Sequence, residues 1–360
     1  MIRVLYVAPF DRETSADGAY ADSLTNALGR TGKVEVVRGV TWAPDRSGLE
    51  HNGPSAYAKA IEELARSSKV DLVHIHYEPG LYSPRAAWGL SRRAKRMPPL
   101  VVTLHRVAAY NGRLRGSGLK QARAVGQEWL LARCARMFLV HAEHSARILG
   151  RRYPRVPCEV QAMPVPSDTC NAARKRGGPI LYFGNHHPGK GILEFVMAMQ
   201  RLPEIKAVVA GKSYPKWAEY NEAVRREASK APNVAIEDGW TTGERKHELF
   251  REACAVALPY SALGSGSLVL QDAIAHERPV LASTAEPLRS LVTELGVGLV
   301  AEPGDTATFA EALRRVAEQE LSAFAADLAR ARQTNSEDAI ASRLAALYGR
   351  VLAQNDGRSS

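Results

Sequence analysis

Short runs of Val, Ile and Leu alternate along the chain with segments whose hydrophobic residues recur at helical spacing. After the run Ile2–Ala8, for example, Ala21, Leu24 and Leu28 share one face of a predicted helix. Near-continuous hydrophobic runs are typical of parallel strands buried on both faces. The predicted strands are Ile2–Ala8, Val34–Val40, Val70–Tyr77, Leu100–Val107, Met137–Ala142, Pro179–Gly184, Lys206–Ala210, Asn233–Ile236, Ala255–Pro259, Pro279–Ala282 and Gly298–Val300.

Strand alternating with helix, twice over, predicts an α/β protein of two Rossmann-like, doubly wound parallel-sheet domains that face a cleft. The segment Met163–Asp168 contains two prolines and leads into a polar stretch, so we place the domain boundary there. The predicted domains are residues 1–165 and 166–336. A last helix over residues 337–354 is expected to cross back onto the first domain.

The composition is that of a soluble globular protein, with 45% hydrophobic and 24% charged residues in a chain of 360. No hydrophobic run approaches the roughly 20 residues that cross a bilayer, and the start lacks a signal-peptide pattern, so we expect a cytoplasmic protein. The cysteines are scattered, which argues against a zinc site or a disulfide framework; they are Cys134, Cys158, Cys170 and Cys254.

The positive charge is concentrated in the first half of the chain. Up to Val165 there are 25 Lys and Arg against 14 Asp and Glu, whereas the remainder has 23 against 24. Such asymmetry favours an acidic partner. Arg85–Arg96, which includes Trp88, suits a helix that rests peripherally on the anionic inner face of a membrane, and equally a solvated helix face. Aromatic residues are too sparse there for a nucleic-acid platform.

Two glycine-rich segments are candidate phosphate sites. Gly184–Gly191 follows a predicted strand and precedes a helix whose first N–H groups would be free for an anion, with Lys190 adding a full charge. The segment equally fits a plain turn with a solvated lysine. Gly264–Ser267 precedes a second helix, where its serines suit either an anion site or helix N-caps. Neither segment completes a dinucleotide fingerprint or a Walker motif.

Three further places hold candidate polar residues. Asp17 and Gly18 stand where the first strand leads into its helix, and Asp17 suits an N-cap as well as a ligand contact. His74 and His76 alternate along one strand and share a face, a pattern that buried structural histidines also show. His105 ends the next predicted strand, where the active sites of open parallel sheets lie.

Taken in order, these segments resemble the motifs of retaining glycosyltransferases of the family-4 type, which have the GT-B fold. Asp17–Ala19 resembles the family's N-terminal glycine loop. The other matching segments are Asp71–His76 ("D-V-V-H-x-H"), Val101–His105 ("V-V-T-x-H"), Val140–Ser145 ("V-S-E-x-S"), Gly184–Gly191 ("G-R-L-x-x-E-K-G"), Asn233–Trp240 ("N-V-x-F-x-G-F"), Leu258–Tyr260 ("L-P-S") and Asp272–Ser283 ("E-A-M-A-x-G-x-P-V-V-A-S"). The resemblance covers nearly the whole chain.

The resemblance implies transfer of a hexose from a UDP- or GDP-linked sugar to an acceptor hydroxyl, with retention and without a metal or other cofactor. The acceptor would be a sugar, a lipid-linked saccharide or a natural product, and no nucleic acid is involved. His105 would lie near the transferred sugar as the catalytic residue. The implied donor-binding residues are Gly18, Asn185, Lys190, Gly211, Gly239, Ser265, Gly266, Ser267, Leu268 and Asp272, and the implied acceptor-binding residues are Arg12 and Arg106.

Two positions depart from the family pattern. Asn185 stands where an arginine is expected, which removes one of two diphosphate charges; Arg106, Lys212 or a nearby histidine would have to compensate. Gly264 stands where the first motif glutamate is expected, eight positions before Asp272. These departures leave open a divergent GT-B protein, either related to epimerases or phosphorylases or a non-catalytic module that binds sugar nucleotides.

Overall fold

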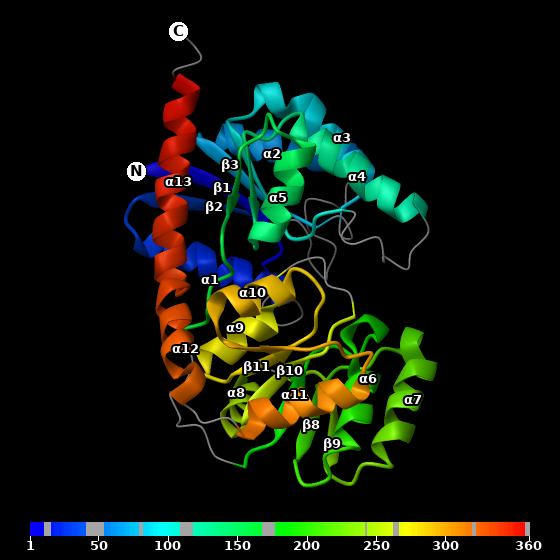
Figure 1. Cartoon of the computed structure of the whole chain (residues 1–360). Helices are drawn as coiled ribbons and strands as arrows, with labels where there is room; N and C mark the ends of the chain where they lie inside the picture. Colours follow the sequence, from blue (N-terminus) through cyan, green and yellow to red (C-terminus); the bar gives the residue numbers. More distant parts are fainter. Residues whose placement is uncertain are drawn as a thin grey trace. The chain divides into compact units, whose positions relative to one another are not determined.

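The computed structural model describes residues 1–10, 16–40, 54–78, 82–108, 118–167, 177–241, 243–261, 266–318 and 322–356. The chain divides into two compact units (Figure 1). Unit 1 comprises Met1–Pro164 and Ser336–Ser360, and unit 2 comprises Val165–Asn335. Unit 1 therefore contains both ends of the chain.

Unit 1 is built on a parallel sheet of six strands in the order β2-β1-β3-β4-β5-β6. Five of these strands were predicted from their hydrophobic runs. The sixth, β6, was not, because its three residues are only partly buried and carry no hydrophobic run. The strands are β1 (Ile2–Ala8), β2 (Val34–Val40), β3 (Leu72–Tyr77), β4 (Leu100–Leu104), β5 (Met137–Val140) and β6 (Cys158–Val160).

Helices cover both faces of this sheet. Ile75 of β3 packs in a hydrophobic core with α2 and α3, whereas His74, on the opposite face, contacts Tyr348 of α13. Helix α13 also packs along α1, where Arg30 pairs with Asp338 at 2.8 Å (Figure 1). The helices are α1 (Ala16–Arg30), α2 (Pro54–Ser67), α3 (Pro84–Arg93), α4 (Gly118–Ala132), α5 (Glu143–Arg152) and α13 (Glu337–Asp356), with a 3-10 turn, η1, at Ala94–Arg96.

Unit 2 repeats the plan with six parallel strands in the order β12-β11-β10-β7-β8-β9. All six were predicted. The strands are β7 (Ile180–Phe183), β8 (Ala207–Gly211), β9 (Val234–Asp238), β10 (Ala255–Leu258), β11 (Val280–Ala282) and β12 (Gly298–Val300). The helical elements are η2 (Pro188–Lys190), α6 (Ile192–Met199), η3 (Pro215–Trp217), α7 (Ala218–Ala228), α8 (Gly243–Glu252), α9 (Leu268–Ala275), α10 (Leu288–Leu295), α11 (Thr306–Glu318) and α12 (Ser322–Thr334).

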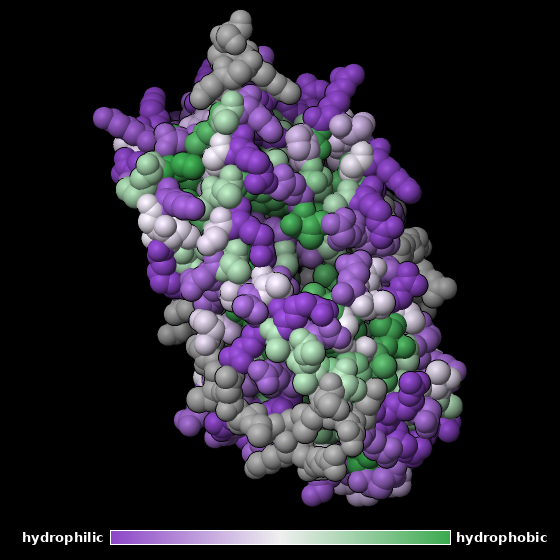
Figure 2. Space-filling view, turned by 60° about the vertical axis from the view of Figure 1, so that its left-hand side comes forward, coloured by the Kyte–Doolittle hydropathy of each residue, from purple (hydrophilic) through white to green (hydrophobic). Residues whose placement is uncertain are grey.

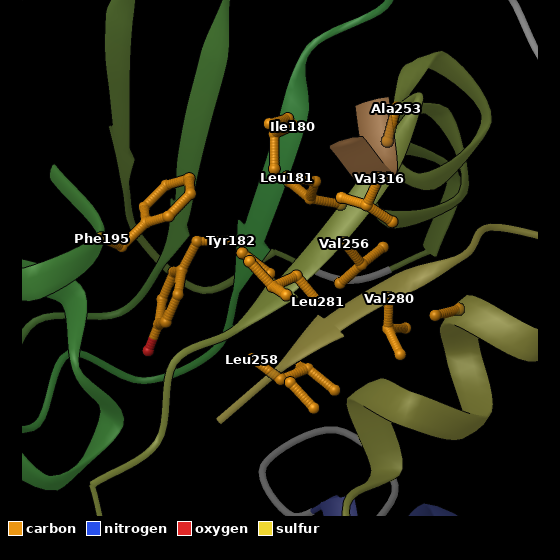
Figure 3. Close-up of a cluster of buried hydrophobic side chains, with 14 of the residues drawn as sticks. Ile180, Leu181, Tyr182, Phe195, Ala253, Val256, Leu258, Val280, Leu281 and Val316 are labelled. Carbon is orange, nitrogen blue, oxygen red and sulfur yellow. The ribbon is translucent and has the colours of Figure 1, made fainter. Parts of the chain in front are cut away.

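The core of unit 2 lies on both faces of its sheet. Tyr182 of β7 contacts Phe195 of α6, while its neighbour Phe183 contacts Phe250 of α8. Because successive side chains of a strand point to opposite faces, α6 and α8 lie on opposite sides of the sheet. Figure 3 shows this core, with side chains of β7, β10 and β11 gathered between the helices. The predicted doubly wound α/β architecture is confirmed.

On the face shown in Figure 2, hydrophilic residues cover most of the surface, and hydrophobic residues form smaller patches between them. Within the described ranges, none of the helices combines the length and hydrophobicity that crossing a membrane requires.

Candidate functional site

Three glycines stand at the carboxyl ends of the adjacent strands β7, β8 and β9. Gly184, Gly211 and Gly239 have φ angles of 139°, 146° and 155°, a region that side-chain-bearing residues rarely adopt. The Gly184 N–H donates to the Ala210 carbonyl, and the Gly239 N–H donates to the Gly211 carbonyl. The edge of the sheet is therefore a ledge of bare backbone, which a ligand can approach closely. We call these three residues the glycine ledge.

Gly211 and Gly239 differ in the space around them. A Cβ at Gly211 would lie 1.9 Å from the Gly184 carbonyl oxygen, whereas a Cβ at Gly239 would meet nothing within 4 Å. Both replacements by alanine strain the backbone, but only Gly211→Ala also forces two strands apart. We expect Gly211→Ala to lower the free energy of unfolding of unit 2 by about 2–3 kcal/mol more than Gly239→Ala. Urea unfolding of both variants measures the difference, and equal losses would contradict it.

The segment Gly184–Gly191 is held against the loop that follows β10. A Cβ at Gly191, whose φ is 67°, would lie 1.8 Å from the Pro259 carbonyl oxygen. The Ser261 N–H donates to the Gly189 carbonyl at 3.1 Å. This contact requires glycine at position 191 and fixes the turn that carries Lys190.

Lys190 lies over the ring of Tyr260, with its Nζ 3.7 Å from the ring centroid. Tyr260 is 1% exposed, so the ammonium group is placed by a rigid partner. A cation–π contact orients a cation without neutralising its charge. Among the described residues no carboxylate forms an ion pair with Lys190. Tyr260 therefore orients the ammonium group of Lys190, and the positive charge of that group remains available to an anion.

The expectation of free N–H groups at the start of the following helix is wrong for its first two residues. The Ile192 and Leu193 N–H groups both donate to the hydroxyl of Tyr220, at 3.1 and 3.2 Å. The Gly189 N–H donates to the His187 ring. Because Tyr220 caps α6 from 27 and 28 residues away in the sequence, no local signal indicated it. The ammonium group of Lys190 is thus the main group at this turn that can bind an anion.

Asn185 is exposed at the same turn, where the family pattern expects an arginine. Its side-chain oxygen accepts a hydrogen bond from the Tyr214 hydroxyl at 3.5 Å, and no charged group replaces the arginine at this contact. Lys212 lies over the Tyr214 ring at 5.5 Å, which brings a cation to the same side of the ledge. Arg106, the other candidate for compensation, lies in unit 1 and pairs with Glu78 at 3.5 Å.

Helix α9 begins beside the second predicted phosphate segment. Ser267 is its N-cap and accepts a hydrogen bond from the Leu270 N–H at 3.3 Å, so the helix-cap interpretation of this serine is confirmed. The N–H groups of Leu268 and Val269 make no hydrogen bond among the described residues. Gly266 immediately precedes this cap, whereas Ser265 and Gly264 lie outside the described residues.

Asp272, the predicted ribose contact, is nearly buried and pairs with Lys246 of α8 at 2.6 Å. Sequence reasoning missed Lys246, because the residue lies on α8 and its partner lies on the next helix, α9, beyond the intervening strand β10. The pair leaves one carboxylate oxygen of Asp272 outside the ion pair. A ligand at this position would therefore meet a lysine beside the carboxylate, not a lone negative charge.

In unit 1, His105 lies directly after β4 between two other histidines. Its Nε2 is 2.8 Å from Nδ1 of His76, and its Nδ1 is 3.2 Å from Nε2 of His141. Burial lowers the pKa of His105 to about 4 and also lowers that of His76, so both rings are neutral at physiological pH. Sequence alternation predicted that His74 and His76 share a face, but it gave no sign of His141.

The loop that carries His105 is anchored by a partly buried pair, Arg152 with the buried Glu128, that sequence reasoning also missed. Glu128 of α4 accepts the Ala108 N–H, and Arg152 of α5 donates to the Ala108 carbonyl at 3.2 Å. Arg152 and Glu128 pair at 2.5 Å. Burial raises the pKa of Glu128 to about 7, against the lowering effects of the Ala108 N–H and of Arg152. The two charged side chains thus hold one residue of the loop by both its backbone groups.

Of the two remaining predicted positions, Gly18 and Arg12, the structure describes only the first. Gly18 lies in the first turn of α1 and is buried, whereas Arg12 lies outside the described residues. The structure brings Asn185, Lys190, Gly211 and Gly239 to one edge of the unit 2 sheet, and it places His105 and Arg106 together after β4 in unit 1.

Both units match known families. Residues 178–319 match the family model described as glycosyl transferases group 1, and residues 12–163 match the glycosyl transferase 4-like domain. None of the curated proteins matches the sequence significantly.

Solved structures share the fold over almost the whole chain. A sucrose-phosphate synthase from Thermosynechococcus elongatus is 17% identical with a TM-score of 0.78, covering 98% of this chain and 100% of that one. HepE from Anabaena, in complex with UDP and glucose, is 16% identical with a TM-score of 0.70, covering 97% and 100%. An alpha,alpha-trehalose-phosphate synthase (UDP-forming) from Burkholderia vietnamiensis is 16% identical with a TM-score of 0.68, covering 99% and 98%.

The two sheets with their flanking helices thus have the GT-B fold. Together with the family matches to both units, this fold identifies the protein as a glycosyltransferase.

Proposed function

We propose that the protein transfers a hexose from a nucleoside-diphosphate sugar to an acceptor hydroxyl, and that Lys190 binds the donor diphosphate. The observation that carries the proposal is the position of the Lys190 ammonium group. The ring of Tyr260 orients this group without neutralising its charge, and the group belongs to the turn that begins at Gly184 of the glycine ledge. The ledge lets a diphosphate approach the backbone, and the ammonium group stabilises the charge that develops on the leaving nucleotide. The N–H groups of Leu268 and Val269, which have no acceptor within the described part of the chain, and the cation of Lys212 support the same role.

The remaining parts of the proposal follow the family resemblance. Gly18 and His105 are assigned to the donor's phosphate and sugar, Asp272 to its ribose together with Lys246, and Arg12 and Arg106 to the acceptor. Transfer proceeds with retention and needs no metal, so EDTA should leave the rate unchanged. The UDP complex of HepE and the UDP-forming activity in the name of the Burkholderia protein favour a UDP-linked sugar as the donor.

A thermal-shift panel tests donor binding on the full chain. UDP-, GDP- and ADP-linked hexoses are added at millimolar concentration, with free sugars as controls. We expect at least one nucleotide sugar to raise the melting temperature, because a ligand that binds only the folded state stabilises it. The absence of any shift would refute donor binding. Binding without turnover would favour the non-catalytic alternative, to which Asn185 points.

We further propose that unit 1 contacts an anionic membrane through α3 and α4, which lie side by side (Figure 1). Trp88 and Trp129 are about half exposed, and each carries an arginine over its ring: Arg92 at 5.0 Å and Arg133 at 4.9 Å. A hollow of about 750 Å³ adjoins Trp129 along α4. Exposed tryptophans among arginines suit the interface of an anionic bilayer, where a lipid-linked acceptor would be found.

Co-sedimentation with vesicles tests this contact. We expect the wild type to bind vesicles that contain phosphatidylserine at low salt, and the double variant Trp88→Ala/Trp129→Ala to bind about tenfold more weakly. Trp240→Ala is the matched control, since Trp240 is similarly exposed but lies in unit 2. No binding of the wild type at low salt would end the membrane proposal and favour a soluble acceptor.

A further inference from the structure

Five polar groups of unit 1 form a continuous line along the carboxyl edge of its sheet. Each comes from a different strand, or from the residue directly after it, and the strands are neighbours in the order β1-β3-β4-β5-β6. In this order the groups are the hydroxyl of Tyr6, the rings of His76, His105 and His141, and the backbone carbonyl of Gln161.

Every neighbouring pair in this line is in hydrogen-bond contact. The Tyr6 hydroxyl contacts Nε2 of His76. Nδ1 of His76 lies 2.8 Å from Nε2 of His105, and Nδ1 of His105 lies 3.2 Å from Nε2 of His141. Nδ1 of His141 lies 2.9 Å from the Gln161 carbonyl oxygen. We call this line the histidine chain.

The carbonyl at one end determines the direction of every bond. A carbonyl oxygen only accepts, so Nδ1 of His141 carries a proton and donates to Gln161. A neutral His141 then has a bare Nε2, which accepts from Nδ1–H of His105. In the same way, the bare Nε2 of His105 accepts from Nδ1–H of His76, and the bare Nε2 of His76 accepts from the Tyr6 hydroxyl. With the rings neutral, one proton occupies each link.

The surroundings of the chain favour this neutral state. His76 is 2% exposed, and the ring of Tyr20 packs against His76, His105 and His141 at centroid distances of 5.4 to 6.1 Å. Burial also raises the pKa of Tyr6 well above its usual value, which keeps its hydroxyl a donor. His74 stands beside the chain but has separate partners: its Nδ1 bonds Tyr348 and its Nε2 bonds Thr103.

We propose that the Gln161 carbonyl, acting through His141, holds His105 as the neutral Nδ1–H tautomer, so that His105 takes part in glycosyl transfer without exchanging a proton. His141, His76 and Tyr6 are then positioning residues. The proposal rests on the proposed function, in which His105 lies near the transferred sugar. Both ring nitrogens of His105 are occupied by other rings, and neither is left to accept a proton from an acceptor hydroxyl.

The tautomers are measured directly by long-range 1H–15N correlation on protein labelled at its histidines. At neutral pH we expect His76, His105 and His141 each to show a protonated Nδ1 and a bare Nε2. The partner of the opposite nitrogen sets a histidine's tautomer. An Nε2–H tautomer or a charged ring at His105 would overturn the proposal, and this measurement on the wild type needs no variant to fold.

Two variants test the direction of the chain. His141→Leu removes the acceptor of His105, and we expect the His105 signals to shift to a mixture of tautomers or to Nε2–H. Tyr6→Phe removes only the far end, so the tautomer of His105 should stay. Tyr348→Phe is the matched control, because its hydroxyl contacts His74 outside the chain. An unchanged His105 in folded His141→Leu protein would contradict the proposal.

Kinetics separate this inference from the proposed function. In an active enzyme, His105→Asn, whose amide can still donate toward His141, should keep about five times the kcat/KM of His105→Ala. Equal inactivation by the two substitutions would indicate proton transfer by the ring and overturn the inference. If instead the tautomers are as expected but no nucleotide sugar is consumed, the proposed function fails and the tautomer assignment stands.

Discussion

Replacing Lys190 with alanine is expected to lower kcat/KM for the nucleotide sugar about 100-fold or more. Among the described residues, Lys190 is the cation fixed at the turn between β7 and α6, and Asn185 supplies no second charge there. Because Tyr220 takes the first two N–H groups of α6, the backbone cannot replace the lost charge. Removing one preorganised group that stabilises a developing anion typically costs a factor of 10²–10³ in rate.

Steady-state kinetics with the donor identified by thermal shift measure this effect. Lys212→Ala is the matched control: it also removes a lysine over a tyrosine ring, but at 5.5 Å and outside the turn, so we expect a loss below about tenfold. Tyr260→Phe should keep both folding and activity, since the buried Tyr260 hydroxyl has no hydrogen-bond partner among the described residues. A Lys190→Ala enzyme within twofold of the wild type would contradict the assigned role.

Unit 1 is expected to lose stability steeply as the pH falls below about 6.5, the pKa of an unperturbed histidine. Burial lowers the pKa of His74 to about 3, that of His105 to about 4, and that of His76 in the same direction. The unfolded chain therefore binds more protons at these three sites than the folded chain, so the free energy of unfolding decreases with falling pH.

Glu128 acts in the opposite direction. Burial raises its pKa to about 7, so the folded state holds a proton there that the unfolded state releases. Three histidines against one glutamate leave a difference of about two protons between pH 6 and pH 5, which corresponds to about 2–3 kcal/mol per pH unit. Over two pH units this loss of about 5 kcal/mol is comparable to the whole stability of a typical domain.

Native-state amide exchange of β3 at pH 6 and pH 5 reports this loss for unit 1 separately from unit 2. A folded His74→Gln variant should show a slope shallower by about 1 kcal/mol per pH unit, because it removes one of the three sites. A stability of unit 1 that stays constant between pH 6 and pH 5 would refute the neutral, buried state of these histidines.

Hydrophobic runs predicted eleven of the twelve strands that the described ranges contain, because strands buried on both faces leave a direct signal in the sequence. β6 left none, since its three residues are half-exposed. The predicted strands located His105 directly after β4 and the turn that carries Asn185 and Lys190 between β7 and α6. Their local chemistry was not predictable, because it depends on partners that only the sheet order brings near.

Tyr220 illustrates this limit. A tyrosine in the first turn of α7 gives no sign in the sequence that its hydroxyl caps another helix, yet this cap removes the N–H groups that a glycine turn was expected to offer. Lys246 beside Asp272 and His141 beside His105 are similar cases, since each pair joins elements that are adjacent in space and separated in the sequence.

Release of nucleoside diphosphate by the purified full chain tests the proposed glycosyl transfer directly. UDP-, GDP- and ADP-hexoses are supplied in turn with a mixture of sugar, sugar-phosphate and lipid-linked acceptors, and the Lys190→Ala variant serves as the control. We expect one donor to release its nucleoside diphosphate at a rate that an acceptor increases and that Lys190→Ala lowers about 100-fold or more. A folded chain that consumes none of these donors, or an equally active Lys190→Ala variant, would contradict the proposal.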